Sequence, residues 1–161
     1  MAQSRKLKQK KPPANLRARA LRLLARREHS RLELEYKLAP HAPDPEELGR
    51  LLGDLARRGW LSERRLVEQV IHARRGQFGS RRIRQELLDK GVAEELIAEV
   101  LPQLEESDVE AARGVWRRKF GSSPRSGNER AQQVRFMQGR GFALETILKI
   151  IKSAGADNDS A

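Results

Sequence analysis

A repeat of about 50 residues constrains this chain more than any other feature of its sequence. The triplet Lys90-Gly91-Val92 corresponds to Arg140-Gly141-Phe142, 50 positions later. Apolar positions recur at the same offset of 50: Leu87 with Met137, Ile97 with Ile147, Val100 with Ile150, and Leu101 with Ile151. A looser upstream copy matches at an offset of 49, where Leu48, Leu51, Leu52 and Leu55 correspond to Ile97, Val100, Leu101 and Leu104. Repeats of this length are typical of stacked copies of one supersecondary unit, so extended surface contact is predicted rather than a single pocketed globule.

Composition limits the size of each core and the class of protein. Of the 161 residues, 38% are hydrophobic and 34% charged, so each copy has only a thin apolar stripe to bury. The chain has no cysteine, which excludes disulfides and thiolate metal sites and suits a reducing compartment. No apolar run approaches the roughly 20 residues that span a bilayer, and no hydrophobic stretch follows the basic N-terminus. A cytoplasmic protein without membrane segments is expected.

The net charge is +11 and is unevenly distributed. Residues 1–60 contain 15 basic and 7 acidic side chains, residues 61–106 contain 8 and 9, and residues 107–161 contain 10 and 6. Arginine outnumbers lysine by 24 to 9. Guanidinium groups pair two-pronged with phosphate or carboxylate, although a GC-rich genome gives the same arginine bias. The net charge predicts polyanions or acidic protein surfaces as partners.

Helical periodicity and capping signals divide the chain into three three-helix units. In the first unit, one helix is expected to begin at Leu16, and a second to run from the capping box Ser30–Glu33 to Leu38. After a non-helical break over 39–43, a third helix is expected from Asp44-Pro45 to Arg58. The second unit comprises helices over 62–75, 80–90 and 93–104, and Pro102 is expected to kink or shorten the last. The third opens with a capping box at Ser107–Glu110 and adds helices near 129–139 and 143–152, after a flexible insertion at 121–127.

The predicted fold class is therefore all-α, with three tandem three-helix repeats forming an elongated, solenoid-like array. The expected boundaries are a disordered basic arm over 1–15, repeats over 16–60, 61–106 and 107–152, and a disordered tail over 153–161. Gly91 and Gly141 are expected to end helices in the left-handed backbone conformation.

Residues that would carry catalysis or bind a cofactor are absent from the sequence. No Gly-Lys dipeptide is present, which excludes a phosphate-binding loop of the GxxxxGK[ST] type. His29, His41 and His72 are scattered without zinc-site spacing or a nucleophile partner. Seven carboxylates between Glu94 and Glu110 lack the alternation around glycine that a calcium loop needs. Neither an enzyme nor a metal or cofactor site is predicted.

Five aromatic residues are candidates for stacking on the bases of single-stranded nucleic acid. Four of them lie beside glycines at the ends of helices or units, and packing between helices is the favoured interpretation for the set. These residues are Trp60, Phe78, Trp116, Phe120 and Phe142.

The ordered set of motifs resembles the RecX family of recombinase regulators. The match covers about residues 16–152 and includes the joining segment Gly59-Trp60-Leu61-Ser62. The other matching residues are Leu24 to Arg27, Ser30, Glu33-Leu34, Lys37-Leu38, Arg74, Gly79, Arg82-Ile83, Glu86-Leu87, Lys90-Gly91-Val92, Phe136, Arg140-Gly141-Phe142 and Ile147. Met137 stands where the family commonly has leucine. The basic arm and the insertion at 122–127 match only loosely.

The resemblance implies a non-enzymatic, monomeric modulator that binds the RecA nucleoprotein filament, with single- or double-stranded DNA as a secondary partner. Such a protein limits filament growth and lowers the recombinase, ATPase and co-protease activities of RecA. Contact residues are predicted from charge alone, as the adjacent arginine pairs near unit joints. They are Arg26 and Arg27, Arg57 and Arg58, Arg64 and Arg65, Arg74 and Arg75, Arg81 and Arg82, and Arg117 and Arg118.

Two alternatives act on DNA directly. A sequence-specific regulator would place a recognition helix in the major groove, for which Arg130, Gln132, Gln133 and Arg135 are the nearest candidate base readers. A nucleoid-type protein would use the basic arm for phosphate contacts without sequence preference.

Overall fold

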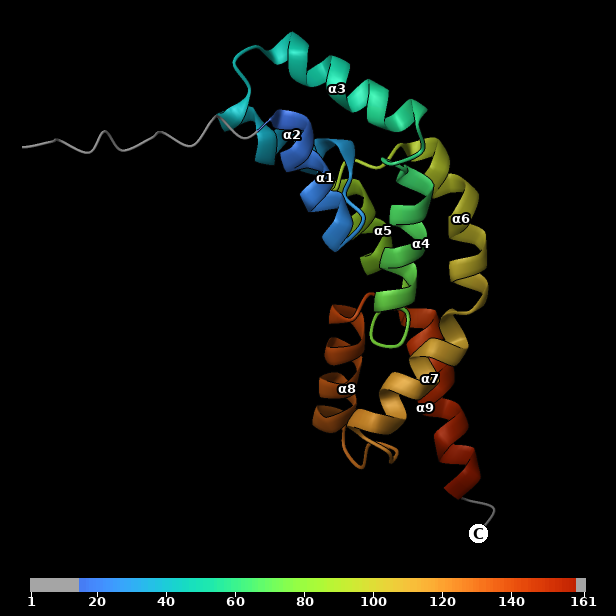
Figure 1. The fold of residues 1–161 in the computed structure, drawn as a ribbon. Coiled ribbons are helices and arrows are strands. Elements are labelled where there is room, and N and C mark those ends of the chain that lie inside the picture. Colours follow the sequence, from blue (N-terminus) through green and yellow to red (C-terminus); the bar gives the residue numbers. More distant parts are fainter. Residues whose placement is uncertain (1–14, 159–161) are drawn as a thin grey trace, which may run out of the picture. The chain divides into compact units, whose positions relative to one another are not determined.

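The computed structural model describes residues 15–158, and all regular structure in that range is helical (Figure 1). The all-α prediction is thus confirmed. The predicted basic arm lies outside the described residues, except for Asn15. Three groups of three α-helices follow one another: α1 Leu16–Arg26, α2 Arg31–Leu38 and α3 Pro45–Arg57; α4 Glu63–Arg74, α5 Ser80–Asp89 and α6 Glu94–Glu106; α7 Asp108–Lys119, α8 Gly127–Gly139 and α9 Leu144–Asn158.

The chain forms two compact units, residues 1–61 and residues 62–161. In the first unit α1, α2 and α3 enclose one leucine-rich core, in which Leu34, Leu52 and Leu55 are fully buried. The second unit holds the other two helix groups, each around its own core. One core centres on Leu66, Ile83 and Leu87, and the other on Met137 and Ile147. Most apolar positions of the 50-residue repeat are buried in these cores, whereas Leu51, Val100 and Leu101 are only partly buried.

Local capping signals set most helix boundaries. The predicted box at Ser30 is formed: the Ser30 hydroxyl accepts from the Glu33 amide at 3.0 Å, and the Glu33 carboxylate accepts from the Ser30 amide at 2.9 Å. Asp44 caps α3 ahead of Pro45. Gly91 and Gly141 have φ angles of +77° and +90°, which confirms the left-handed conformation expected at both.

Three local predictions are wrong, and a fourth, for Pro102, is wrong in its alternative of a shortened helix. Ser107 does not form a capping box, because its hydroxyl donates back into α6, to the carbonyls of Gln103 and Leu104 at 3.1 and 3.2 Å. A 3₁₀ turn, η1, covers Ala39–His41, since Pro40 lies at its start, where no amide is needed. Pro102 does not shorten α6, which continues to Glu106 with the proline ring exposed.

The remaining difference is the C-terminal tail. The helix α9 continues to Asn158, whereas disorder was predicted from residue 153. Ala154 packs against the third core, and the Ser153 hydroxyl donates to the Lys149 carbonyl at 2.6 Å. The apolar contact of Ala154 thus lies beyond the predicted end of the helix. Residues 159–161 lie outside the described range.

Core packing is confirmed for most of the aromatic residues. Trp116 and Phe142 are buried, and Phe78 and Phe120 pack at the edges of the second and third cores. Trp60 is the exception: its side chain is 46% exposed, because it follows the left-handed Gly59 on the outside of the turn that ends α3.

Candidate functional site

The turn between α4 and α5 packs directly on the turn between α8 and α9, so the second and third helix groups share a joint. The Gly79 amide donates to the Arg140 carbonyl at 2.7 Å, and the Arg81 amide donates to the Gly141 carbonyl at 3.3 Å. The backbones approach so closely that a Cβ on Gly79 would lie 2.6 Å from the carbonyl carbon of Gly141. Only glycine permits this approach.

A buried carboxylate joins the same two groups. Asp108, the first residue of α7, accepts a hydrogen bond from the Ser80 amide at 2.9 Å and another from the Ser80 hydroxyl. Its third donor is the Arg75 guanidinium, at 3.0 Å. The Arg75 side chain is only 20% exposed and also donates to the Ser107 hydroxyl at 2.5 Å. This network links the end of α4 with the starts of α5 and α7.

Cations and aromatic rings alternate beside the joint. The guanidinium groups of Arg82 and Arg140 lie 4.5 and 5.1 Å from the centre of the Phe78 ring. Arg140 also lies 5.1 Å from the centre of the Phe136 ring, to which Lys119 contributes a second cation at 5.2 Å. Since these ring faces already contact cations, they support the joint rather than offer a free surface for base stacking.

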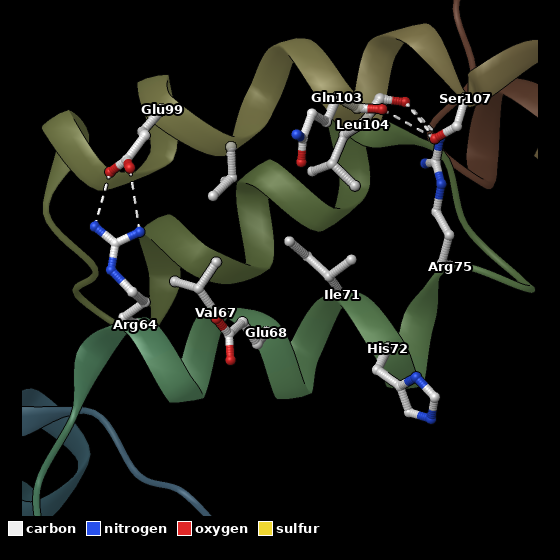
Figure 2. Close-up of a pocket in the computed structure, with 11 residues that line it drawn as sticks. Arg64, Val67, Glu68, Ile71, His72, Arg75, Glu99, Gln103, Leu104 and Ser107 are labelled. Atoms are coloured by element: carbon white, nitrogen blue, oxygen red, sulfur yellow. Dashed lines mark hydrogen bonds and ion pairs between the residues drawn. The ribbon is translucent and has the colours of Figure 1, made fainter.

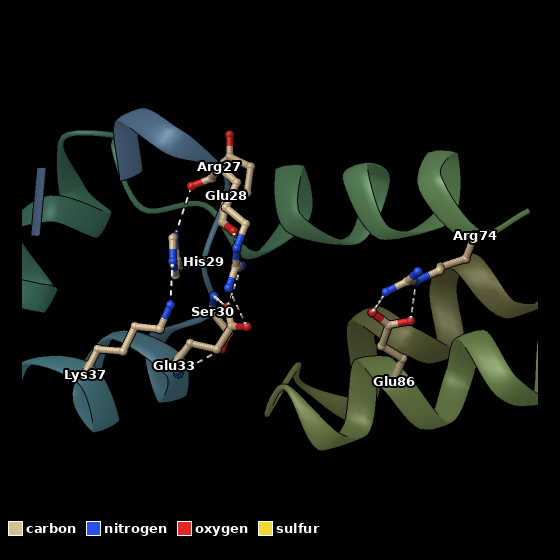
Figure 3. Close-up of polar contacts among 8 residues, drawn as sticks. All are labelled: Arg27, Glu28, His29, Ser30, Glu33, Lys37, Arg74 and Glu86. Atoms are coloured by element: carbon tan, nitrogen blue, oxygen red, sulfur yellow. Dashed lines mark hydrogen bonds and ion pairs between the residues drawn. The ribbon is translucent and has the colours of Figure 1, made fainter. Parts of the chain in front are cut away.

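Most of the predicted contact arginines are bound within the protein. Arg27 meets Glu33 at 3.3 Å, and Arg74 makes a two-pronged contact with Glu86 at 2.9 and 3.3 Å (Figure 3). Arg64 pairs in the same way with Glu99, at 3.0 and 3.2 Å. The hydrogen bonds and charge of Arg64 hold the pKa of Glu99 below its ordinary value. These arginines have less freedom to bind an external anion than the sequence suggests.

Asp54 gathers a second set of arginines in the first unit. It lies 3.0 Å from Arg58 and 3.7 Å from Arg57, and it also contacts Arg17. Lost hydration raises the pKa of Asp54, but the charges and hydrogen bonds of Arg58 and Arg17 outweigh this effect and leave the pKa below its ordinary value. Asp54 therefore stays ionised and holds the end of α3 against α1.

The remaining predicted arginines differ in how they are held. Arg26, Arg81 and Arg117 are exposed, and no side-chain partner for them lies within residues 15–158. Arg65 is exposed, whereas Arg82 and Arg118 donate to the carbonyls of Gly139 and Gly76. Neighbouring residues on a helix point about 100° apart, which is why Arg27, Arg82 and Arg118 are bound while Arg26, Arg81 and Arg117 beside them are open.

A basic groove lies between α1 and the α2–η1 segment of the first unit. Its volume is about 610 Å³, and Leu23 and Leu38 contribute its apolar lining. All of its charged or titratable side chains are basic: Arg19, Arg22, Arg26, Lys37 and His41. Sequence reasoning found only Arg26. The spacing of Arg19, Arg22 and Arg26, at i, i+3 and i+7, is the signal that would have placed all three on one face of a helix.

His29 contacts Lys37, one of the residues that line this groove (Figure 3). The ring is 2% exposed; its Nδ1 lies 3.0 Å from the Arg27 carbonyl, and its Nε2 lies 3.3 Å from the Lys37 ammonium. Because Lys37 has only protons to donate, Nε2 must accept, and the imidazole is neutral. Burial is the main cause that lowers the pKa of His29 below 6.5, and the charges of Arg27 and Lys37 add to it.

The candidate base readers on α8 do not form a set. Gln133 is buried, accepts from the Trp116 indole at 2.9 Å and donates to the Ser122 carbonyl at 3.2 Å. Arg130, Gln132 and Arg135 are exposed. Since Gln133 holds the insertion at 121–127 against the third core, it is not available to read a base edge.

Neither a metal-binding cluster nor a membrane-spanning helix occurs in the described part of the chain. No cluster of three or more metal-ligating side chains occurs there. None of the helices between residues 15 and 158 is long and apolar enough to cross a bilayer.

Comparison with known proteins identifies the family. The family description "RecX, second three-helix domain" matches residues 62–101, and "RecX, third three-helix domain" matches residues 105–151. The Regulatory protein RecX of Leptothrix cholodnii is 46% identical over 92% of this chain and 95% of its own length. The chain belongs to the RecX family.

Other relatives agree in name and length. The Regulatory protein RecX of Ralstonia pickettii is 45% identical over 90% of both chains, and that of Neisseria meningitidis is 39% identical over 92% of this chain and 96% of its own. The crystal structure of RecX from Lactobacillus salivarius has the same fold, with a TM-score of 0.73 at 17% identity over 89% of this chain and 97% of that one. These names support a regulatory role.

Proposed function

We propose that this RecX-family protein binds the RecA nucleoprotein filament and limits its growth, thereby lowering its recombinase, ATPase and co-protease activities. The basic groove of the first unit is the observation that carries the proposal. Its three arginines, one lysine and one histidine face a common space of about 610 Å³ with no carboxylate among the lining residues. Such a groove suits an extended polyanion, and the filament presents one along its axis.

The exposed arginines of the second unit add contacts in this proposal. Arg65, Arg81 and Arg117 point outward from three different helices, and Arg26 belongs to the groove itself. Arg75 is not included, because its guanidinium is bound inside the joint. Regulation by binding requires no catalytic activity of this protein. In this proposal the protein acts in the cytoplasm, and it acts as a monomer.

The test is a titration of DNA-dependent ATP hydrolysis by RecA, with filament length measured by electron microscopy on the same samples. We expect inhibition and shorter filaments at or below one protein per RecA protomer, and no hydrolysis by this protein alone. An unchanged rate and an unchanged length across the whole titration would overturn the proposal. Binding to bare DNA that matches filament binding at physiological salt would favour a direct DNA-binding protein instead.

A further inference from the structure

A small pocket of the second unit collects positive charge at the joint between the second and third helix groups. Its volume is about 240 Å³, and its charged lining residues are Arg118 and Lys119 at the end of α7 and Arg140, which follows α8. Gln77, from the turn after α4, adds a side-chain amide, and no carboxylate lines the pocket. All of these residues belong to the second unit, so the pocket is distinct from the basic groove of the first.

The three cations are held in place without an acidic partner. Arg118 donates to the Gly76 carbonyl, whereas Lys119 and Arg140 lie 5.2 and 5.1 Å from the centre of the Phe136 ring. None of the three forms an ion pair with a residue between 15 and 158. A carbonyl oxygen and a ring face orient a cation, but they carry no net charge. The positive charges therefore remain uncompensated.

The repeat identifies the position from which the acidic partner is missing. Lys119 corresponds to Arg74, at the offset of 45 residues between the starts of α4 and α7. Phe136 corresponds to Glu86 in the 50-residue register. In the second group Arg74 and Glu86 form the two-pronged ion pair of Figure 3. The third group has a lysine over a ring instead, so the carboxylate that neutralises the cation in one copy is absent from the other.

Other arginines of the second helix group have partners inside the protein. Figure 2 shows Arg64 of α4 reaching Glu99 of α6, and Arg75 reaching Ser107. Arg75 also meets Asp108. Three like charges gathered without such partners repel one another, and a bound anion relieves this repulsion. The pocket at the joint thus has the electrostatics of a site for an external anion.

Charge and volume limit the class of anion. The ends of α7 and α8 contribute about half a negative charge each, so about two positive charges remain. A phosphate monoester carries about 1.5 to 2 negative charges and has three terminal oxygens for three separate donors, whereas a carboxylate has one charge and two oxygens. The volume of about 240 Å³ is below the roughly 300 Å³ at which ligand clefts begin, so the pocket suits a phosphate group rather than a whole nucleotide.

We propose that this pocket binds a phosphate monoester, supplied by the end of a nucleic-acid strand or by a free nucleotide. Arg118, Lys119 and Arg140 each donate to a terminal oxygen, and Gln77 adds a fourth donor. This ligand goes beyond the proposed function and does not depend on it, because the pocket lies outside the basic groove and phosphate binding is measured without RecA.

The experiment uses the full chain, labelled with ¹⁵N, and two single-stranded oligonucleotides of about ten nucleotides. They differ only at the 5′ end, which carries a phosphate in one and a hydroxyl in the other. Affinity is measured by fluorescence anisotropy at about pH 7.5, where the terminal phosphate is close to doubly charged. We expect the phosphorylated strand to bind at least about fivefold more tightly, with additional amide shifts at Gln77, Arg118 and Lys119.

Adenosine monophosphate distinguishes the two sources of the phosphate. An affinity equal to that of the phosphorylated strand, with the same amide shifts, assigns the pocket to a free nucleotide. A weaker affinity with the same shifts assigns it to a strand end, because the rest of the strand then contributes to binding.

Three variants test the pocket by its charge. Lys119→Gln removes one cation and should reduce the preference for the phosphorylated strand to about twofold or less. Lys119→Glu places a carboxylate in the pocket and should abolish the preference. Arg113→Gln, the control, removes a charge from an exposed position of the same helix outside the pocket and should retain the preference. Far-UV circular dichroism confirms that each variant is folded.

Three outcomes would overturn this assignment. The first is equal affinity for the two strands, and the second is a preference that survives both changes at Lys119. The third is a set of pocket shifts with acetate as large as those with inorganic phosphate at the same concentration, which would assign the pocket to carboxylates of a protein surface. A failure to inhibit RecA with an intact phosphate preference would contradict the proposed function alone.

Discussion

At the scale of single residues, Gly141 meets two requirements that no other residue type satisfies together. Its φ angle is +90°, which L-residues with a Cβ rarely adopt. A Cβ at this position would also lie 2.6 Å from the Arg82 amide nitrogen. The first requirement is conformational and local, and the second arises from the joint with α5.

A comparison of two alanine variants separates these requirements. Gly59 has a φ angle of +75°, and no atom lies within 4 Å of the position that a Cβ would take, so Gly59→Ala should cost only the conformational strain, about 1–2 kcal/mol. Gly141→Ala should cost more, because the Arg82 backbone must also move. Urea denaturation of both variants measures the difference. Equal losses of stability would show that the joint yields without cost.

His29 predicts that the stability of the first unit depends on pH. Burial and the charges of Arg27 and Lys37 lower its pKa below 6.5, so the folded state resists protonation. Below pH 6.5 the unfolded chain binds the proton more readily than the folded one, and the free energy of unfolding falls as the pH decreases. The contribution is fully present above pH 6.5 and changes by at most about 1.4 kcal/mol per pH unit.

Thermal melting between pH 8 and pH 5 checks this expectation. The parent should lose stability below pH 6.5, and His29→Gln should start from a lower stability with a flatter pH profile. His72→Gln, at an exposed histidine, is the control and should follow the parent. A parent whose melting temperature stays constant down to pH 5 would contradict the neutral assignment of His29.

At the scale of helices, the Asp108 network fixes how the second and third groups meet. Asp108 and Arg75 are 9% and 20% exposed, so removing the carboxylate leaves a largely buried guanidinium without its partner. We expect Asp108→Ala to destabilise the second unit by about 3–5 kcal/mol. By contrast, Glu99→Ala breaks an ion pair whose side chains are more than half exposed, and should change stability little.

Urea denaturation followed by the fluorescence of Trp116, with Trp60 of the first unit replaced by phenylalanine in every variant, reports on the second unit, since the Trp116 indole is buried in the third core. Ser80→Ala removes one donor to Asp108 and should give an intermediate loss. If Asp108→Ala is no more damaging than Glu99→Ala, the network does not hold the joint.

Helix boundaries were predictable from sequence because their causes are local. Ser30 with Glu33, Asp44 with Pro45, and Gly91 each act within a few residues of the boundary that they set. Prediction failed where a distant contact competes. Ser107 has the spacing of a capping box, but its hydroxyl is bonded to α6 and to Arg75.

The same distinction applies to the binding surface. Adjacent arginines look equivalent in sequence, yet Arg74 and Arg75 are bound to partners 12 and 33 positions away. Such pairings depend on how helices pack, which the 50-residue repeat does not specify. The local spacing of Arg19, Arg22 and Arg26 did contain the information for the basic groove, but a criterion of adjacent pairs does not detect it.

At the scale of the whole molecule, the distribution of charge predicts how binding depends on salt. Residues 1–60 contain 15 basic and 7 acidic side chains, and the basic groove lies among them. Replacing Arg19, Arg22 and Arg26 with glutamine removes three positive charges from one groove. If all three contact phosphate, the slope of log K against log salt should fall by about two units, at roughly 0.7 per contact with a single strand.

A second triple variant tests whether position or net charge matters. Arg84, Arg113 and Arg135 are exposed in the second unit, and replacing them with glutamine removes the same total charge. Binding to RecA–DNA filaments is measured for both variants between about 50 and 200 mM salt. The groove variant should lose affinity and salt dependence, and it should inhibit the ATPase less, whereas the control should stay close to the parent because its arginines do not share a groove. Equal losses in the two variants would mean that the filament senses only net charge, and the groove would lose its place in the proposed function.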